Sequence, residues 1–137
     1  MRKYLISGYT IHIVSHIIGT LFWLAIGHSL TWLPTVLVVT IVSYVILFRL
    51  MRGINRDRLM FSSRVILGMN ILLLGSGFFI HNISEALGSW ILSAGIYFNY
   101  GFYALLTMNI PDLLGMTLMI LLSPMLLYIG AVMNSDK

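Results

Sequence analysis

Four long apolar runs, separated by short polar segments, dominate the chain. They cover residues 4–27, 31–50, 62–82 and 112–133. A helix rises about 1.5 Å per residue, so roughly 20 apolar residues cross the hydrocarbon layer of a membrane, which is about 30 Å thick. Each run has about this length. The pattern therefore predicts an all-α, polytopic integral membrane bundle of four transmembrane helices, with residues 1–137 forming a single transmembrane domain.

The segment between the third and fourth runs, residues 86–108, has a mixed composition. It is long enough to cross a membrane, but it contains Asn99, several glycines and serines, and a group of aromatic residues, namely Tyr97, Phe98, Tyr100, Phe102 and Tyr103. Tyrosine in particular favours the headgroup boundary of a membrane. We therefore expect an interfacial or re-entrant segment here. A fifth transmembrane helix is the alternative.

The basic residues lie beside the apolar runs. Of the eight Lys and Arg residues, five occur within 49–64 and the others lie near the two ends of the chain. With four transmembrane helices all eight fall on one side, whereas a fifth helix would move only Lys137 to the other. Because Lys and Arg accumulate in cytoplasmic loops, we expect the N-terminus and the arginine-rich loop 49–64 to be cytoplasmic. The net charge of +4 is then a topology signal, and no nucleic-acid partner is expected.

The composition excludes several classes of protein. Hydrophobic residues make up 59% of the chain and charged residues only 9%, and the mean hydropathy is +0.97. Soluble domains carry about 25% charged residues, so the chain has too few charges to cover a water-soluble surface. Disordered chains are poor in apolar residues, which excludes disorder. The absence of cysteine excludes disulfides, thiolate nucleophiles and cysteine metal ligands.

Polar and small residues recur on one face of the first and third runs. The first stripe contains His12, His16, Gly19, Trp23 and Gly27, and the second contains Ser63, Asn70, Gly77 and His81. Because polar groups are costly in hydrocarbon, both stripes are predicted to face the bundle interior and each other. His16 and Asn70 lie at matching depths, and we expect them to approach each other near the middle of the membrane. The spacing of His12 and His16 also suits a metal, but no carboxylate accompanies them, which favours hydrogen-bonded packing.

A second group of residues is predicted to lie at the outer boundary of the membrane. His28 and His81 share this level, Glu85 follows His81 by one helical turn, and Asp112 opens the last run. Imidazole and carboxylate groups together suit zinc, copper or iron, so these four residues form a candidate transition-metal site. A single haem b held between the two histidines is an alternative. The competing interpretation is that all four are interfacial side chains in contact with headgroups and water.

The function is constrained mainly by what the membrane runs lack. The deep part of each run contains no Asp, Glu or Lys, which argues against a carrier built on a buried carboxylate and against most catalytic dyads. We therefore expect the chain not to be an enzyme by itself. The leading prediction is a non-catalytic accessory or structural subunit of a larger membrane complex. Its expected partners are membrane lipid and other subunits or further copies of itself. The alternatives are a metal- or haem-binding redox protein and a small oligomeric channel or transporter.

Overall fold

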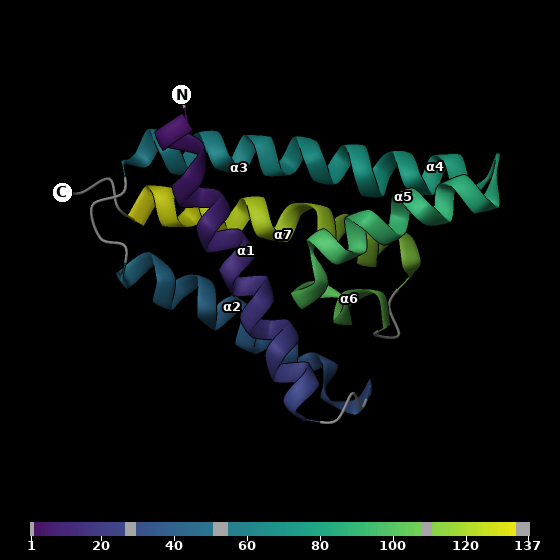
Figure 1. Ribbon diagram of the computed structural model, residues 1–137, viewed down its shortest axis with the longest axis horizontal. Helices are drawn as coiled ribbons and strands as arrows, with labels where there is room; N and C mark the ends of the chain where they lie inside the picture. The colour runs from purple at the N-terminus through teal and green to yellow at the C-terminus, as the bar shows by residue number, and fades with distance from the viewer. Residues whose placement is uncertain (1, 27–29, 51–54, 108–110, 134–137) are drawn as a thin grey trace.

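The structure is a computed structural model that describes residues 2–26, 30–50, 55–107 and 111–133. Within these residues every regular element is helical (Figure 1). Four long elements form the bundle. They are α1 (Arg2–Ala25), α2 (Leu33–Leu50), α7 (Asp112–Met133), and a continuous rod composed of α3 (Arg56–Asn70), the π-helical turn η2 (Ile71–Gly75) and α4 (Ser76–His81). Shorter elements are the 3₁₀ turns η1 (Leu30–Trp32) and η3 (Tyr100–Phe102), and the helices α5 (Glu85–Phe98) and α6 (Ala104–Thr107).

The four predicted membrane helices are confirmed as helices of suitable length and apolarity. Among the described residues, those long and apolar enough to cross a membrane are Gly8–Ala25, Leu33–Leu50, Arg56–His81 and Asp112–Met133. The predicted boundaries differ from these mainly in the third helix, which begins six residues earlier than the apolar run. Its first turns carry arginines, so hydropathy alone places its start too late.

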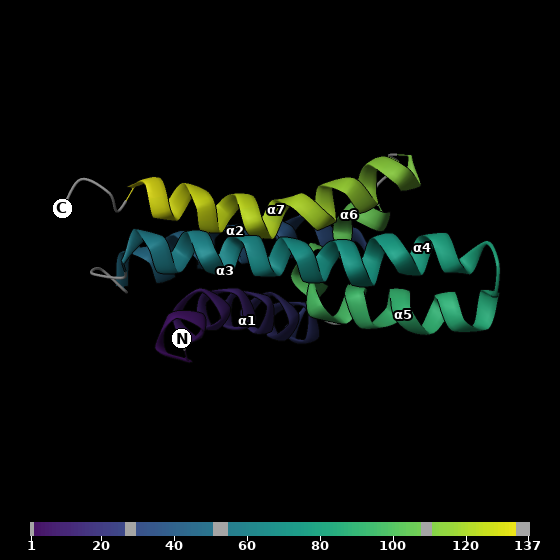
Figure 2. The ribbon, with the colours of Figure 1, turned by 90° about the horizontal axis from the view of Figure 1, so that it is seen from above.

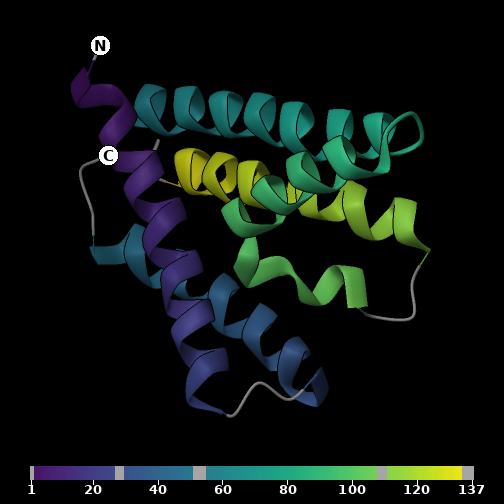
Figure 3. The same cartoon turned by 45° about the vertical axis from the view of Figure 1, so that its right-hand side comes forward.

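Charge is distributed unevenly between the two ends of the bundle. The start of α1, the end of α2, the start of α3 and the end of α7 lie together at one end (Figures 1 and 3). This basic end carries the described arginines, whereas Glu85 and Asp112 open α5 and α7 at the opposite, acidic end. This arrangement agrees with the prediction that an even number of crossings places the basic segments together.

Helix α5 folds back along α4 as a tight antiparallel hairpin. A Cβ atom added to Gly88 would collide with the backbone of His81, and one added to Gly77 would lie 2.9 Å from the backbone nitrogen of Leu92. Glycines thus let the two backbones approach closely, as is common between helices in membranes. The hairpin carries the chain from the acidic end of the bundle towards its centre.

The segment 85–107 enters and leaves the bundle at the same end. Helix α5 ends at Phe98 in the interior, η3 reverses the direction of the chain, and α6 leads back towards the acidic end (Figure 1). Seen from above, the α3–α4 rod lies between α7 on one side and α1 and α5 on the other (Figure 2). The most extensive helix pairing is that of α3 with α7. The reversal η3 packs against α1 and α2, so it lies among the long helices.

Candidate functional site

A group of buried polar residues surrounds the reversal at the centre of the bundle. We call it the central polar network and define it as the side chains of His12, His16, Thr40, Tyr44, Asn70, Asn99 and Ser123 with the backbone of Gly101. Each of these side chains is at most 5% exposed. They come from α1, α2, α3 and α7 and from the end of α5, so the network connects all the major helices.

Both polar groups of the Gly101 backbone are bonded to side chains from other helices. The Gly101 N–H donates to Nδ1 of His16 at 3.0 Å, and the Thr40 hydroxyl approaches the Gly101 carbonyl at 3.3 Å. A buried backbone group without a partner costs about as much as a lost hydrogen bond, and no water replaces it in hydrocarbon. Helices α1 and α2 thus supply the hydrogen bonds that the interruption of regular helix removes.

The bond from Gly101 determines which nitrogen of His16 carries the proton. Because Nδ1 accepts a hydrogen bond, the neutral imidazole must carry its proton on Nε2. That nitrogen lies 3.3 Å from Oγ of Ser123 and 3.4 Å from Oη of Tyr44. Tyr44 also lies 2.6 Å from Nδ1 of His12. His16 is therefore a donor towards Ser123 and Tyr44.

This protonation state bears on catalysis, because Ser123 and His16 resemble a serine–histidine dyad by distance alone. A serine nucleophile needs a basic imidazole nitrogen that takes its proton, with the other nitrogen protonated and held by an acceptor. Here the arrangement is reversed, since Nε2 donates to Ser123 and Nδ1 accepts from Gly101. In this tautomer Nε2 already carries a proton, and Nδ1 is engaged by the Gly101 N–H of the reversal.

Asn99 links three helices through its amide group. Its Nδ2 atom donates to Oδ1 of Asn70 at 2.8 Å and to the Gly95 carbonyl at 3.1 Å, which caps the end of α5. Its Oδ1 atom accepts from the Ser123 hydroxyl at 3.2 Å. The prediction that His16 and Asn70 face a common interior is confirmed, since both are buried. They are joined through Ser123 and Asn99 and do not bond each other directly.

A second interruption of regular helix, at Pro124 in α7, is also compensated by side chains. Proline has no N–H, so the carbonyl four residues earlier, that of Ile120, loses its partner within the helix. Asn70 donates to this carbonyl at 3.0 Å, and Ser63 donates to the carbonyl of Pro124 at 2.8 Å. Ser63 and Asn70 are the seven-residue repeat seen in the sequence. Their spacing is explained by two successive bonds from α3 to α7.

The predicted outer site is only partly within the described residues. His28 lies outside them, whereas His81, Glu85 and Asp112 are exposed at the acidic end. One assumption was wrong: α4 ends at His81 and Glu85 begins α5, so these residues do not share one continuous helix face. His81 instead lies 3.3 Å from the hydroxyl of Ser89 on α5. No three His, Asp or Glu side chains of the described ranges are grouped so as to hold a metal. The site that includes His28, with its metal or haem, stays a prediction.

Sequence reasoning missed several members of the network. In the sequence, Asn99 indicated only that its segment is interfacial. A single amide side chain among aromatic residues also indicates a buried hydrogen bond. Thr40 and Ser123 carried no signal, because serine and threonine in a helix can bond their own preceding carbonyl. Thr40 does so as well, donating to Val36 at 2.8 Å.

Comparisons with models of known protein families, with characterised proteins and with solved structures found no match to this chain. The chemistry of its own residues is therefore the basis for assigning a function.

Proposed function

We propose that the protein is a non-catalytic structural subunit of a larger membrane assembly. The observation that supports this most strongly is that the central polar network is neutral and that its main hydrogen bonds join the helices to one another. Its donors and acceptors are matched to the interrupted backbone at Gly101 and Pro124. Side chains engaged in this way stabilise one arrangement of helices, and the buried side chains of the described residues include no carboxylate.

The proposal includes a placement in the membrane. The basic end faces the cytoplasm, because positively charged residues favour that side. The segment 85–107 is re-entrant: it enters from the outer face, reverses at Gly101 and returns. Backbone that departs from a helix at membrane depth is tolerated where protein covers it. The bonds to Gly101 from His16 and Thr40 support this placement.

The faces offered to other subunits are apolar. Only 28–39% of the residues in each candidate span are buried within the chain, so most of each helix surface is left for lipid or for protein. The α4–α5 hairpin carries strongly exposed apolar side chains, with Trp90 78% and Ile83 76% exposed. Large aromatic side chains frequently dominate the affinity of interfaces. We expect this hairpin to be the main contact with a partner subunit or a second copy.

The assembly is tested by extracting the protein gently in a lipid nanodisc and measuring the mass of the particle. The expected result is a particle of fixed stoichiometry, larger than one chain, that is weakened by Trp90→Ala. Met133→Ala, at 73% exposure and at the opposite end, is the matched control and should leave the particle unchanged. A monomer that carries ions or solutes across liposomes by itself would contradict the proposal.

That contradictory result would favour a second candidate, a small channel or transporter. The re-entrant hairpin is the observation in its favour, because interrupted helices in channels and transporters place backbone groups and polar side chains along the path of a solute. In this chain the same groups are bonded to one another. The structural role is therefore the better supported of the two.

A further inference from the structure

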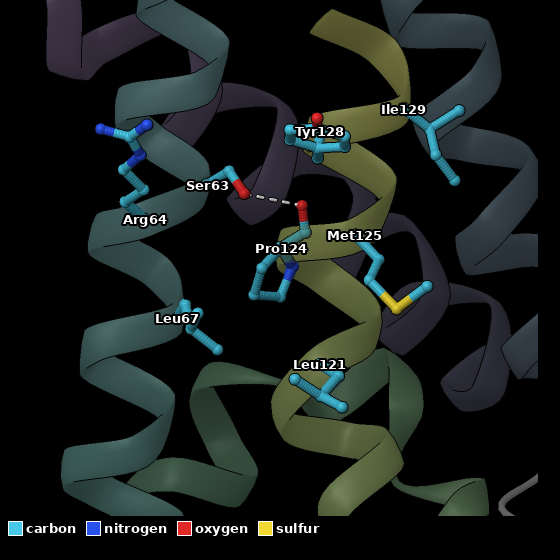
Figure 4. Close-up of a pocket in the computed structure, with 8 residues that line it drawn as sticks. All are labelled: Ser63, Arg64, Leu67, Leu121, Pro124, Met125, Tyr128 and Ile129. Carbon is cyan, nitrogen blue, oxygen red and sulfur yellow. Dashed lines mark hydrogen bonds between the residues drawn. The ribbon is translucent and has the colours of Figure 1, made fainter. Parts of the chain in front are cut away.

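An apolar groove of about 300 Å³ lies between α3 and α7 on the outside of the bundle (Figure 4). Arg64 and Leu67 line it from α3, and Leu121, Pro124, Met125 and Tyr128 line it from α7. The bond from Ser63 to the Pro124 carbonyl joins the two helices beside the groove. The polar groups of this contact are thereby satisfied, and the surface that remains for a ligand is almost entirely apolar.

The groove is polar at one end and apolar at the other. Arg64 and Tyr128 lie at the same level, one on each helix, whereas Leu67 and Leu121 lie at the opposite end (Figure 4). Arg64 is two turns from the start of α3, and Tyr128 is little more than one turn from the end of α7. The polar end therefore faces the basic end of the bundle, where lipid headgroups would lie.

The charge at the polar end is available for a ligand. The Arg64 side chain is exposed and makes no ion pair with a carboxylate of the described residues, of which Asp57 is the nearest along the chain. Arginine presents several N–H donors that match the oxygens of a phosphate group. Its aliphatic stem can lie along apolar surface while the guanidinium reaches the headgroup level. Tyr128 adds a hydroxyl at the same level on α7.

We propose that this groove binds an anionic phospholipid from the leaflet at the basic end. The phosphate contacts Arg64 and Tyr128, and one acyl chain runs along Leu67 and Leu121 past the ring of Pro124. Met125 has a flexible, polarizable side chain, which suits contact with a chain that changes conformation. A helix of a second copy fits less well, since a purely apolar helix would leave the arginine without an anion.

The charge requirement is tested by native mass spectrometry of the intact chain titrated with phosphatidylglycerol or phosphatidylcholine. We expect one tightly bound phosphatidylglycerol and weaker binding of phosphatidylcholine. Arg64→Gln should weaken the binding of phosphatidylglycerol about fivefold, since one basic residue near a membrane surface has about that effect. Arg64→Lys should retain part of the affinity. Arg56→Gln removes an exposed arginine outside the groove and is the matched control.

The role of the groove is tested separately by filling it. Met125→Trp should reduce the binding of phosphatidylglycerol, whereas Met133→Trp, outside the groove, should not. Equal losses in Arg64→Gln and Arg56→Gln would show diffuse attraction to the basic end and would overturn the site. Equal binding of the two lipids would also overturn it, because it would indicate a non-selective lipid shell. A dimer that persists without bound lipid and is lost in Met125→Trp would assign the groove to a second copy instead.

Discussion

Replacing Gly101 with alanine is expected to destabilise the protein by about 1–3 kcal/mol, the usual cost of forcing extra atoms into a packed interior. The added Cβ would lie 2.7 Å from Cγ2 of Thr40 and 2.9 Å from Nδ1 of His16, and closer still to the Thr40 hydroxyl. The side chains that bond the Gly101 backbone would have to move away. The substitution therefore strains the packing and also breaks these hydrogen bonds. Reversible unfolding in mixed detergent micelles measures the change in free energy.

Gly68 provides the matched control for this experiment. It lies within α3, and a Cβ added there meets nothing within 4 Å. Because alanine is favoured over glycine in a helix, Gly68→Ala should be neutral or stabilising by up to about 1 kcal/mol. Similar losses in both variants would show that the crowding at Gly101 has no energetic consequence.

Asn70→Ala is expected to cost about 2 kcal/mol, and most of that cost should depend on Pro124. The substitution leaves the Ile120 carbonyl without its partner, and the Asn99 amide keeps its bond to Gly95 but loses the one to Asn70. Single hydrogen bonds in membrane proteins contribute about 0.6–2 kcal/mol, and the unpaired carbonyl is the more costly of the two losses, since proline denies it any partner in its own helix. In a Pro124→Ala background the alanine N–H bonds Ile120, so Asn70→Ala should then cost about 1 kcal/mol less.

The control for this double-mutant cycle is Pro111, which directly precedes α7. The missing N–H of a proline at the start of a helix removes no bond within the helix. Asn70→Ala and Pro111→Ala should therefore be additive. Equal coupling in the two cycles, or none in either, would refute the assignment of Asn70 as the partner of the interrupted helix.

The four long helices were predictable because each contains an apolar run long enough to cross a membrane. The runs 31–50 and 112–133 match the observed helices almost residue for residue, since apolar sequence begins and ends with the helix. The third helix extends beyond its apolar run, because the arginines after Asn55 are also good helix formers and Asn55 caps the helix by bonding the Asp57 N–H at 2.8 Å. Hydropathy therefore locates the apolar part of this helix but does not detect the residue that caps its start.

The path of the segment 85–107 was only partly predictable. Its mixed composition indicated that it was not an ordinary crossing, and a re-entrant course was one of the expectations. Where it reverses depends on partners far away in sequence, since Asn99 bonds Asn70 and Gly101 bonds His16. Local sequence does not show such pairings.

The candidate site residues, like the segment 85–107, were only partly predictable from the sequence. His16 and Asn70 were identified because a polar side chain in hydrocarbon must face the interior, whichever partners it finds. The expected pairing of His81 with Glu85 failed because it assumed a continuous helix. Asn82 and Ser84, both common turn residues, lie between them, and the chain reverses there.

The central claim, that the segment 85–107 enters and leaves the membrane on one side, is tested most directly by labelling single cysteines with a membrane-impermeant maleimide. The chain contains no cysteine, so each engineered thiol is read without background. Glu85→Cys and Asp112→Cys occupy exposed positions on either side of the segment, and Asp57→Cys is exposed at the opposite end. We predict that Glu85→Cys and Asp112→Cys are labelled from the same side, and that Asp57→Cys is labelled only from the other. Labelling of Glu85→Cys and Asp112→Cys from opposite sides would show a fifth crossing and contradict the account.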